Sequence, residues 1–436
     1  MAAAAITAAT GCGNGAAAGR LGPGGPGETV QDTALRRLAA ELLPAAEARA
    51  GLPARGPVRL ASRSRSELEA FLIDEMSRQL PPDRIEAVVR TYARLGLVPD
   101  SLDLEPLLRS LLLEQVVGYY DPARDTLYVL DRVDESLIEP VLLHEMVHAL
   151  QDQYMDLDSL MRSNLHANDR GTAAQAAMEG HATFAMFEWQ MARLTGTEAD
   201  LTELPGLESL LGDDPLAAAG LDMPVLTEAP TVIRESLLFP YLGGLLFVQR
   251  LWSGDAGRIP PLGDRMPTST EQVLHPERFA DGAVDHPTDV VFASEPPGPW
   301  AEILTDGLGE LETRLLLREF LPDREGADRA AAGWDGDRYR LLDGPPGEVF
   351  VWATVWDSDV DAAQFEEAVA EALRLRYGGE PGAMGRSVRV RREETQGRPT
   401  VTILDLPLVD GAGPAELPPD LQAFRLGTGE PGGDGR

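Results

Sequence analysis

The hydrophobic and polar positions divide the first half of the chain into helical and strand-like stretches. Helical patterns fill residues 31–113, and two runs of β-branched and aromatic residues, 115–120 and 126–131, flank the turn-forming sequence DPARD. This arrangement predicts a β-hairpin. Residues 137–153 follow with apolar side chains on nearly every side and their only proline in the first turn, so a buried helix is expected there. A second long helix is expected over 172–194.

The second half of the chain predicts a change of architecture. The apolar run 236–248 is shorter than the roughly 20 residues that a membrane span needs, so it is expected to be another buried helix. Proline and glycine cluster over 255–300, where we place a domain boundary. We therefore expect an α+β fold with two domains. A mostly helical domain over 31–285, with a small sheet that carries the hairpin, precedes a smaller α+β domain over 290–410.

Both ends of the chain are low in complexity. Residues 1–30 are rich in alanine and glycine, and residues 411–436 are expected to be a disordered tail. Cys12 follows the sequence ATG and precedes GNG, an arrangement that resembles a bacterial lipoprotein processing site. The two interpretations are a lipid anchor at Cys12 and a flexible leader. We expect a cell-envelope or secreted protein that contacts a membrane only through such an anchor.

The charge narrows the range of partners. The chain has 71 acidic residues against 38 basic ones, all of them arginine, which gives a formal net charge of −33. A surface of this sign repels nucleic acid and anionic lipid, so neither is expected as a partner. The single cysteine excludes an intrachain disulfide. The composition, 43% hydrophobic and 25% charged, is that of an ordinary globular protein.

The helix expected over 137–153 carries the HExxH pattern at His144 to His148. Residues four apart share one face of a helix, so both imidazoles can reach one tetrahedral metal ion, and Glu145 is placed to act on a water at that metal. A buried polar group without a partner costs about 2 to 7 kcal/mol, and a metal would satisfy both histidines. The alternative is a pair of core histidines bonded to the backbone.

A catalytic zinc ion needs a third protein ligand. The helix expected over 172–194 offers Glu179 and His181, which lie about 200° apart around the helix and cannot both face one metal. We expect Glu179 to be the ligand. The alternatives are His181 and, in the loop before this helix, Asp169 or His166.

The sequence HEMVHALQDQ, followed at this distance by EGHAT, resembles the gluzincin type of zinc metallopeptidase, whose third ligand is a glutamate on a later helix. It is also similar to bacterial zincin-like envelope proteins in which a hairpin such as VGYYDPARDTLYVL leads into the motif. The resemblance covers about residues 105–280. It implies one zinc ion bound by His144, His148 and Glu179, with Glu145 as general base. The chain departs from many gluzincins at Thr183, where they carry an acidic residue.

The metzincin pattern HExxHxxGxxH is absent, because Gln151 and Tyr154 occupy its glycine and third histidine. Three other residues are candidates for supporting roles. Asp152 could accept the outer N–H of a ligand histidine or position the helix against a neighbour, or be an ordinary capping or solvent-facing residue near the helix end. Tyr241 and His275 could donate to an oxyanion, although a core position fits Tyr241 and a helix end fits His275 equally well. We expect no role for His286.

The sequence therefore predicts a zinc-dependent metallopeptidase that cleaves a peptide or protein substrate with a water activated by Glu145. The edge of the predicted hairpin could hold an extended peptide through main-chain hydrogen bonds. One alternative is a zinc hydrolase of a cell-wall amide or other non-peptide bond. Another is an envelope binding protein or chaperone with a vestigial site, against which Glu145 argues, because a structural zinc site has four protein ligands and no base.

Overall fold

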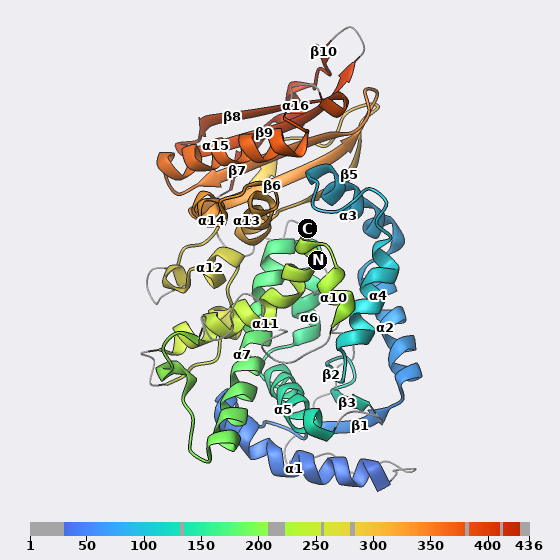
Figure 1. Ribbon diagram of the computed structural model, residues 1–436, viewed down its shortest axis with the longest axis vertical. Coiled ribbons are helices and arrows are strands. Elements are labelled where there is room, and N and C mark those ends of the chain that lie inside the picture. The colour runs from blue at the N-terminus through green and yellow to red at the C-terminus, as the bar shows by residue number, and fades with distance from the viewer. Residues whose placement is uncertain are drawn as a thin grey trace.

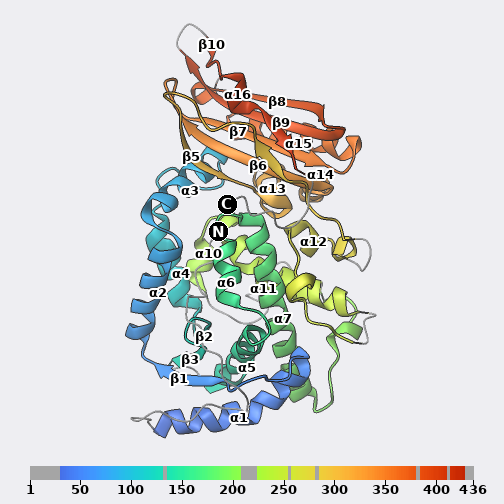
Figure 2. The same ribbon diagram turned by 180° about the vertical axis from the view of Figure 1, so that it is seen from behind.

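The computed structural model describes residues 30–130, 135–207, 223–253, 257–279, 284–379, 383–409 and 413–427. Cys12 and the leader that contains it lie outside these residues. The described part has the expected α+β fold, with most helices in the first two thirds of the chain and the largest sheet in the last third (Figure 1). That sheet lies at one end of the molecule, while the first helix and a small sheet lie at the other (Figure 2).

The described part of the chain begins with four helices and a short strand. These are α1 (Val30–Ala50), β1 (Arg59–Arg63), α2 (Arg65–Gln79), α3 (Pro82–Leu95) and α4 (Leu104–Gln115). Helix α2 begins at a capping box, in which the Ser64 hydroxyl accepts from the Glu67 backbone and the Glu67 carboxylate accepts from the Ser64 backbone. Helix α3 ends at Gly96, whose positive φ of 79° suits a helix C-terminus.

The predicted hairpin is present as β2 (Gly118–Asp121) and β3 (Thr126–Leu130). Strand β1 pairs in parallel with β3, so the small sheet has the order β1-β3-β2 and β2 is one of its edges. The turn is closed by a hydrogen bond from the Arg124 backbone to the carbonyl of Asp121. The edge strand β2 of this hairpin contacts the next helix along the chain.

The helices that follow form the centre of the molecule. They are α5 (Glu135–Asp152), α6 (Leu157–Ser163), α7 (Asn168–Thr195), α10 (Pro224–Glu228), α11 (Thr231–Trp252) and α12 (Thr270–Leu274). Helix α5 is buried as its pattern predicts: Leu142, Leu143, Met146 and Val147 have no exposed surface. Helix α7 begins earlier than expected, so Asp169 lies in its first turn and not in a loop.

Helices α7 and α11 lie against each other along much of their length. Their backbones meet at two glycines: a Cβ atom on Gly180 would lie 2.0 Å from the carbonyl carbon of Gly244. Helix α11 has the length and composition of a membrane span, although the apolar run within it is short. More than half of its most apolar window, 56%, is buried, because this face packs inside the protein.

The last third of the chain contains two further sheets. One has six strands in the order β10-β9-β7-β6-β5, with β8 paired to β9, and all of its neighbours are antiparallel. Its strands are β5 (Ala301–Asp306), β6 (Trp334–Asp343), β7 (Val349–Trp356), β8 (Arg386–Thr395), β9 (Arg398–Val409) and β10 (Gly413–Pro414). Helices α13 (Gly309–Phe320), α14 (Arg324–Ala331) and α15 (Asp359–Arg376) pack against it.

Strand β7 is buried on both faces of this sheet. Trp352 and Trp356 pack against Phe365 of α15, with ring centroids 5.5 and 4.4 Å apart. Ala353 and Val355 point to the other face, where they contact a strand pair formed by β4 (Val290–Phe292) and β11 (Phe424–Leu426).

The expectation of a disordered tail over 411–436 is wrong for residues 413–427, which form β10, α16 (Pro419–Gln422) and β11. Leu421 is fully buried and Leu426 is 9% exposed. The backbone of β11 is satisfied by pairing with β4, far away in sequence. Elements of two to four residues have too little periodicity to be recognised in a sequence rich in proline and glycine.

One hydrophobic cluster runs through both parts of the molecule. It includes Tyr92 of α3, Phe247 of α11, Leu316 of α13 and Trp352 of β7. Polar contacts cross at the same place, because the Tyr92 hydroxyl donates to Glu312 at 2.6 Å. The division into domains over 31–285 and 290–410 stays a prediction.

Candidate metal centre

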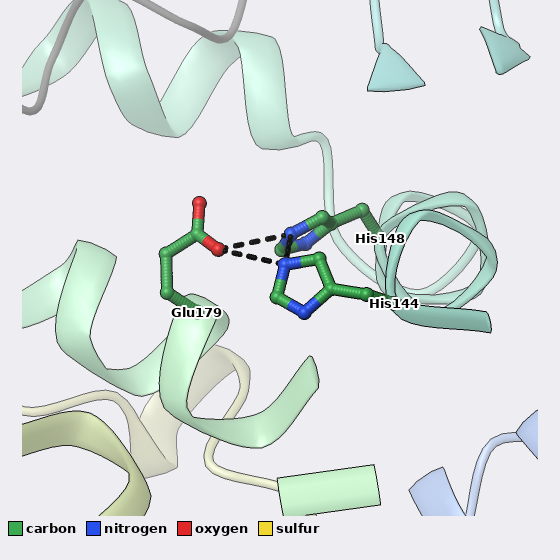
Figure 3. Close-up of side chains that lie close together, drawn as sticks. All are labelled: His144, His148 and Glu179. Atoms are coloured by element: carbon green, nitrogen blue, oxygen red, sulfur yellow. Dashed lines mark hydrogen bonds and ion pairs between the residues drawn. The ribbon is translucent and has the colours of Figure 1, made fainter. Parts of the chain in front are cut away.

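Helices α5 and α7 bring three ligand-type atoms together. Nε2 of His144 and Nε2 of His148 lie 3.1 and 3.2 Å from Oε2 of Glu179, and the two nitrogens lie 3.1 Å from each other (Figure 3). The three atoms form a nearly equilateral triangle. The side chains of both histidines are 11% exposed and that of Glu179 is 22% exposed, so the carboxylate is the more open side of the group.

The local sequence explains this convergence. The two histidines are one helical turn apart in α5 and face the same neighbour, as their spacing predicts. Glu179 comes from α7, whose face toward the core consists largely of alanines. The small side chains let the helices approach closely, and Gly180 next to Glu179 allows the same on the side of α11.

The spacing and chemistry of the triangle fit a metal ion. Two nitrogen atoms and one carboxylate oxygen are ligands that zinc accepts. In tetrahedral coordination with bonds of about 2.0 to 2.1 Å, neighbouring ligand atoms lie about 3.3 Å apart. The measured separations of 3.1 to 3.2 Å are close to this value. Residues His144, His148 and Glu179 can therefore hold one ion.

The charges within the triangle favour a bound cation. Burial raises the pKa of Glu179, but His148 and His144 outweigh this effect and hold its pKa far below the ordinary range. Burial lowers the pKa of His148, but the charge of Glu179 and its hydrogen bond outweigh burial and raise this pKa to about 9. Both shifts show that positive charge is favoured between these side chains. A metal ion would supply this charge and would compete with protons for the same atoms.

Glu145 lies beside the triangle and faces the edge strand. Its Oε2 accepts a hydrogen bond from the backbone N–H of Tyr120 in β2 at 2.8 Å. A Cβ atom on Gly118 would lie 3.9 Å from the Cγ of Glu145, so β2 passes close to this side chain. Burial raises the pKa of Glu145, although both histidines pull it down. The Glu145 carboxylate therefore lies between the two histidines and strand β2.

Tyr241 of α11 closes another side of the group. Its ring lies 6.2 Å from the ring of His144, at an interplanar angle of 29°. Burial raises the pKa of its hydroxyl well above the ordinary value, and the charges of Glu179 and Glu145 add to this effect. Among the described residues the hydroxyl makes no hydrogen bond, so its proton is available to a ligand.

The other predicted residues lie elsewhere. Nε2 of His275 bonds Glu310 at 2.8 Å, in a contact between α12 and α13. His181 is fully buried and bonds Ala50, and burial lowers its pKa to about 4. Asp169 accepts from Thr270, and His166 contacts Arg84. None of these described contacts involves the triangle.

Among the described contacts, Asp152 bonds a neighbouring strand and the turn after α5, and no ligand histidine. Its carboxylate accepts from the Tyr120 hydroxyl at 2.8 Å and from the Leu157 backbone at 3.0 Å, so it fixes the turn that follows α5. The outer nitrogen of His148 is instead bonded by Gln151, at 2.8 Å. We missed Gln151 in the sequence. Its position three residues after His148, on a neighbouring part of the same helical face, is a signal that could have indicated it.

Comparisons with known proteins assign no function to the triangle. Residues 301–412 match a family described as a domain of unknown function, DUF8575; this region contains no residue of the triangle. No curated protein matches the chain. A crystal structure from Chloroflexus aurantiacus, described as a proposed hydrolase with a novel fold, is similar at a TM-score of 0.35 and 18% identity. The likeness covers 59% of this chain and 91% of that one.

Proposed function

We propose that this protein is a zinc-dependent metallopeptidase of the gluzincin type. The observation that carries the proposal is the triangle of His144, His148 and Glu179 with the carboxylate of Glu145 beside it, one oxygen of which accepts from the Tyr120 backbone. The three residues of the triangle would hold one zinc ion. Zinc bound there would supply Lewis acidity toward a carbonyl oxygen and toward water.

Glu145 would act as general base and then as general acid. It takes a proton from the water that attacks the carbonyl carbon, and it returns that proton to the nitrogen of the leaving amine as the carbon–nitrogen bond breaks. Its hydrogen bond from the Tyr120 backbone fixes one carboxylate oxygen and leaves the other for this work. A structural zinc site has four protein ligands and needs no base, so a carboxylate beside a group of three ligands argues against a binding protein with a vestigial site.

Tyr241 would stabilise the negative charge that develops on the carbonyl oxygen. Its hydroxyl is a donor without a hydrogen-bond partner among the described residues, and its ring stands next to that of His144. The raised pKa keeps the hydroxyl protonated at neutral pH. A donor prepared in this way acts mainly in the transition state.

The substrate would be an extended peptide placed along β2. This strand is an edge of its sheet and passes next to Glu145. Because the Tyr120 N–H points outward to Glu145, alternation along the strand places the main-chain groups of Gly118 on the same outer side. These groups are suited to pair with a peptide backbone, which favours a peptide over a non-peptide amide.

The first test is to measure zinc content and cleavage of an unstructured protein such as casein, with and without a chelator. The wild type is compared with Glu145→Gln. The matched control is Glu139→Gln, the same change in the same helix at a residue that pairs with Arg193 on the surface.

We expect one zinc ion in all three proteins, and chelator-sensitive cleavage by the wild type and the control alone. Absence of zinc from the wild type would overturn the proposal. Zinc in all three with no cleavage by any of them would argue for a non-peptide substrate.

A further inference from the structure

A buried chain of hydrogen bonds leads from the end of α1 to the triangle. The carbonyl oxygen of Ala50 lies 2.9 Å from Nε2 of His181, and Nδ1 of His181 lies 3.1 Å from Nε2 of Gln151. Oε1 of Gln151 then lies 2.8 Å from Nδ1 of His148. Gln151 and His181 have no exposed surface. Each of these bonds must therefore be satisfied by protons within the chain itself.

A fourth contact fixes which way the Gln151 amide points. Its Nε2 lies 3.0 Å from the carbonyl oxygen of Met178, which can only accept a hydrogen bond. The opposite orientation would place two acceptors against each other, so the nitrogen must face Met178. The two amide hydrogens are then used by Met178 and by Nδ1 of His181.

The orientation of this amide fixes the protons on both histidines. Since Nδ1 of His181 accepts from Gln151, the ring proton of His181 is on Nε2, where it donates to Ala50. Oε1 of Gln151 can only accept, so His148 must donate to it from Nδ1. A neutral His148 then has its lone pair on Nε2, the atom that belongs to the triangle. This is the tautomer that a metal ligand needs.

Gln151 also fixes the two ligand helices relative to each other. It belongs to α5, one turn after His148, and its partner Met178 immediately precedes Glu179 in α7. One side chain thus bonds a histidine ligand and the backbone next to the carboxylate ligand. His181 is held in turn by the edge of Trp252, at a ring distance of 5.3 Å.

We propose that Gln151 and His181 are positioning residues that set the tautomer of His148 and the placement of α5 against α7, and that they thereby raise the affinity of the triangle for zinc. The inference rests on the proposed function, because it assumes that the triangle binds a metal. Loss of an outer hydrogen-bond partner of a metal ligand typically weakens metal affinity by about 10- to 100-fold.

The test compares Gln151→Leu with Gln153→Leu. Both changes remove an amide of the same shape, one in the last turn of α5 and one directly after it, but the described bonds of the Gln153 amide go only to the backbones of Arg55 and Gly56. Zinc affinity is measured by competition with a coloured chelator, and the absorption spectrum of bound cobalt reports the ligand geometry.

We expect Gln151→Leu to weaken zinc binding by about 10- to 100-fold and to change the cobalt spectrum, while Gln153→Leu does neither. His181→Phe should weaken binding in the same direction. If the wild type binds zinc and Gln151→Leu binds it equally well, the buried chain of hydrogen bonds has no influence on the metal. This inference then fails while the proposed function stands. If the wild type binds no zinc, the proposed function itself fails.

A second measurement decides the matter should Gln151→Leu fail to fold. Nitrogen NMR of the wild-type protein, labelled at its histidines, reports the tautomer of His181. The described hydrogen bonds of His181 go to Gln151 and Ala50 and not to a residue of the triangle. A proton on Nε2 is expected. A proton on Nδ1 of His181 would contradict the directions assigned to the hydrogen bonds between Ala50 and His148, and it would overturn the inference.

Discussion

The close contact of α7 with α11 predicts that alanine at position 180 is far more harmful than alanine elsewhere in α7. In Gly180→Ala the new Cβ atom would lie 2.0 Å from the backbone of Gly244, whereas ordinary contacts begin at 3.4 Å. The helices would have to separate by more than 1 Å. Overpacking of this kind costs about 1 to 3 kcal/mol, against the 0.5 to 1 kcal/mol that alanine normally gains over glycine in a helix.

Gly171→Ala is the matched control, because it makes the same change in the same helix. Its Cβ atom would meet Asn164 at 3.4 Å, so this variant should be as stable as the wild type or slightly more stable. We expect chemical denaturation to place Gly180→Ala below Gly171→Ala by about 2 kcal/mol or more in free energy of unfolding.

The metal centre should respond more strongly than the fold. Glu179 is adjacent to Gly180, and metal ligands tolerate displacements of only about 0.2 Å. Zinc affinity measured on both variants should therefore fall in Gly180→Ala alone. Equal stability and equal zinc affinity of the two variants would mean that the contact between the glycines does not position Glu179.

Three further outcomes are expected. Tyr241→Phe should lower kcat by about 10²- to 10³-fold with unchanged zinc content; an unchanged kcat would exclude an oxyanion role. Zinc at 1,000 times its Kd should stabilise the protein by about 4 kcal/mol, so a chelator that leaves the unfolding midpoint unchanged would argue against a metal site. Burial raises the pKa of Asp169 to about 7 in spite of its hydrogen bonds from Thr270, so the folded state favours the protonated carboxyl. The resulting stabilisation is full below about pH 4 and is lost as the pH rises through 7. Asp169→Asn removes this pH dependence. Relative to the wild type, its free energy of unfolding should rise by about 4 kcal/mol between pH 4 and pH 8, as measured by chemical denaturation at both pH values. An equal difference at the two pH values would contradict the raised pKa.

The sequence predicts well those features that depend on local periodicity. The hairpin and helices α5 and α7 follow from patterns within about twenty residues, and the spacing of His144 and His148 places both on one helical face. The angular separation of Glu179 and His181 around α7 predicts only that one of them, and not both, can face the metal. The structure brings Glu179 to the histidines and turns His181 toward α1.

The features that were missed depend on contacts between distant segments. Asp152 continues the spacing of the two histidines, but the nearby Tyr120 hydroxyl takes its carboxylate. Gln151 became the partner of His148 because α7 supplies an acceptor and an imidazole on its other side. Such a network can be recognised only when both helices are in place. The pairing of β11 with β4 is non-local in the same way.

The hydrophobic cluster shared by the helices and the large sheet affects how the molecule unfolds. Apolar side chains of α3 and α11 are covered in part by α13 and β7, so the helical part shares one of its hydrophobic clusters with the large sheet. Arg84 of α3 also reaches Asp306 of β5. Calorimetry should therefore record a single heat-absorption peak for both parts. A shortened chain that ends before β5 would expose this apolar surface to water and aggregate.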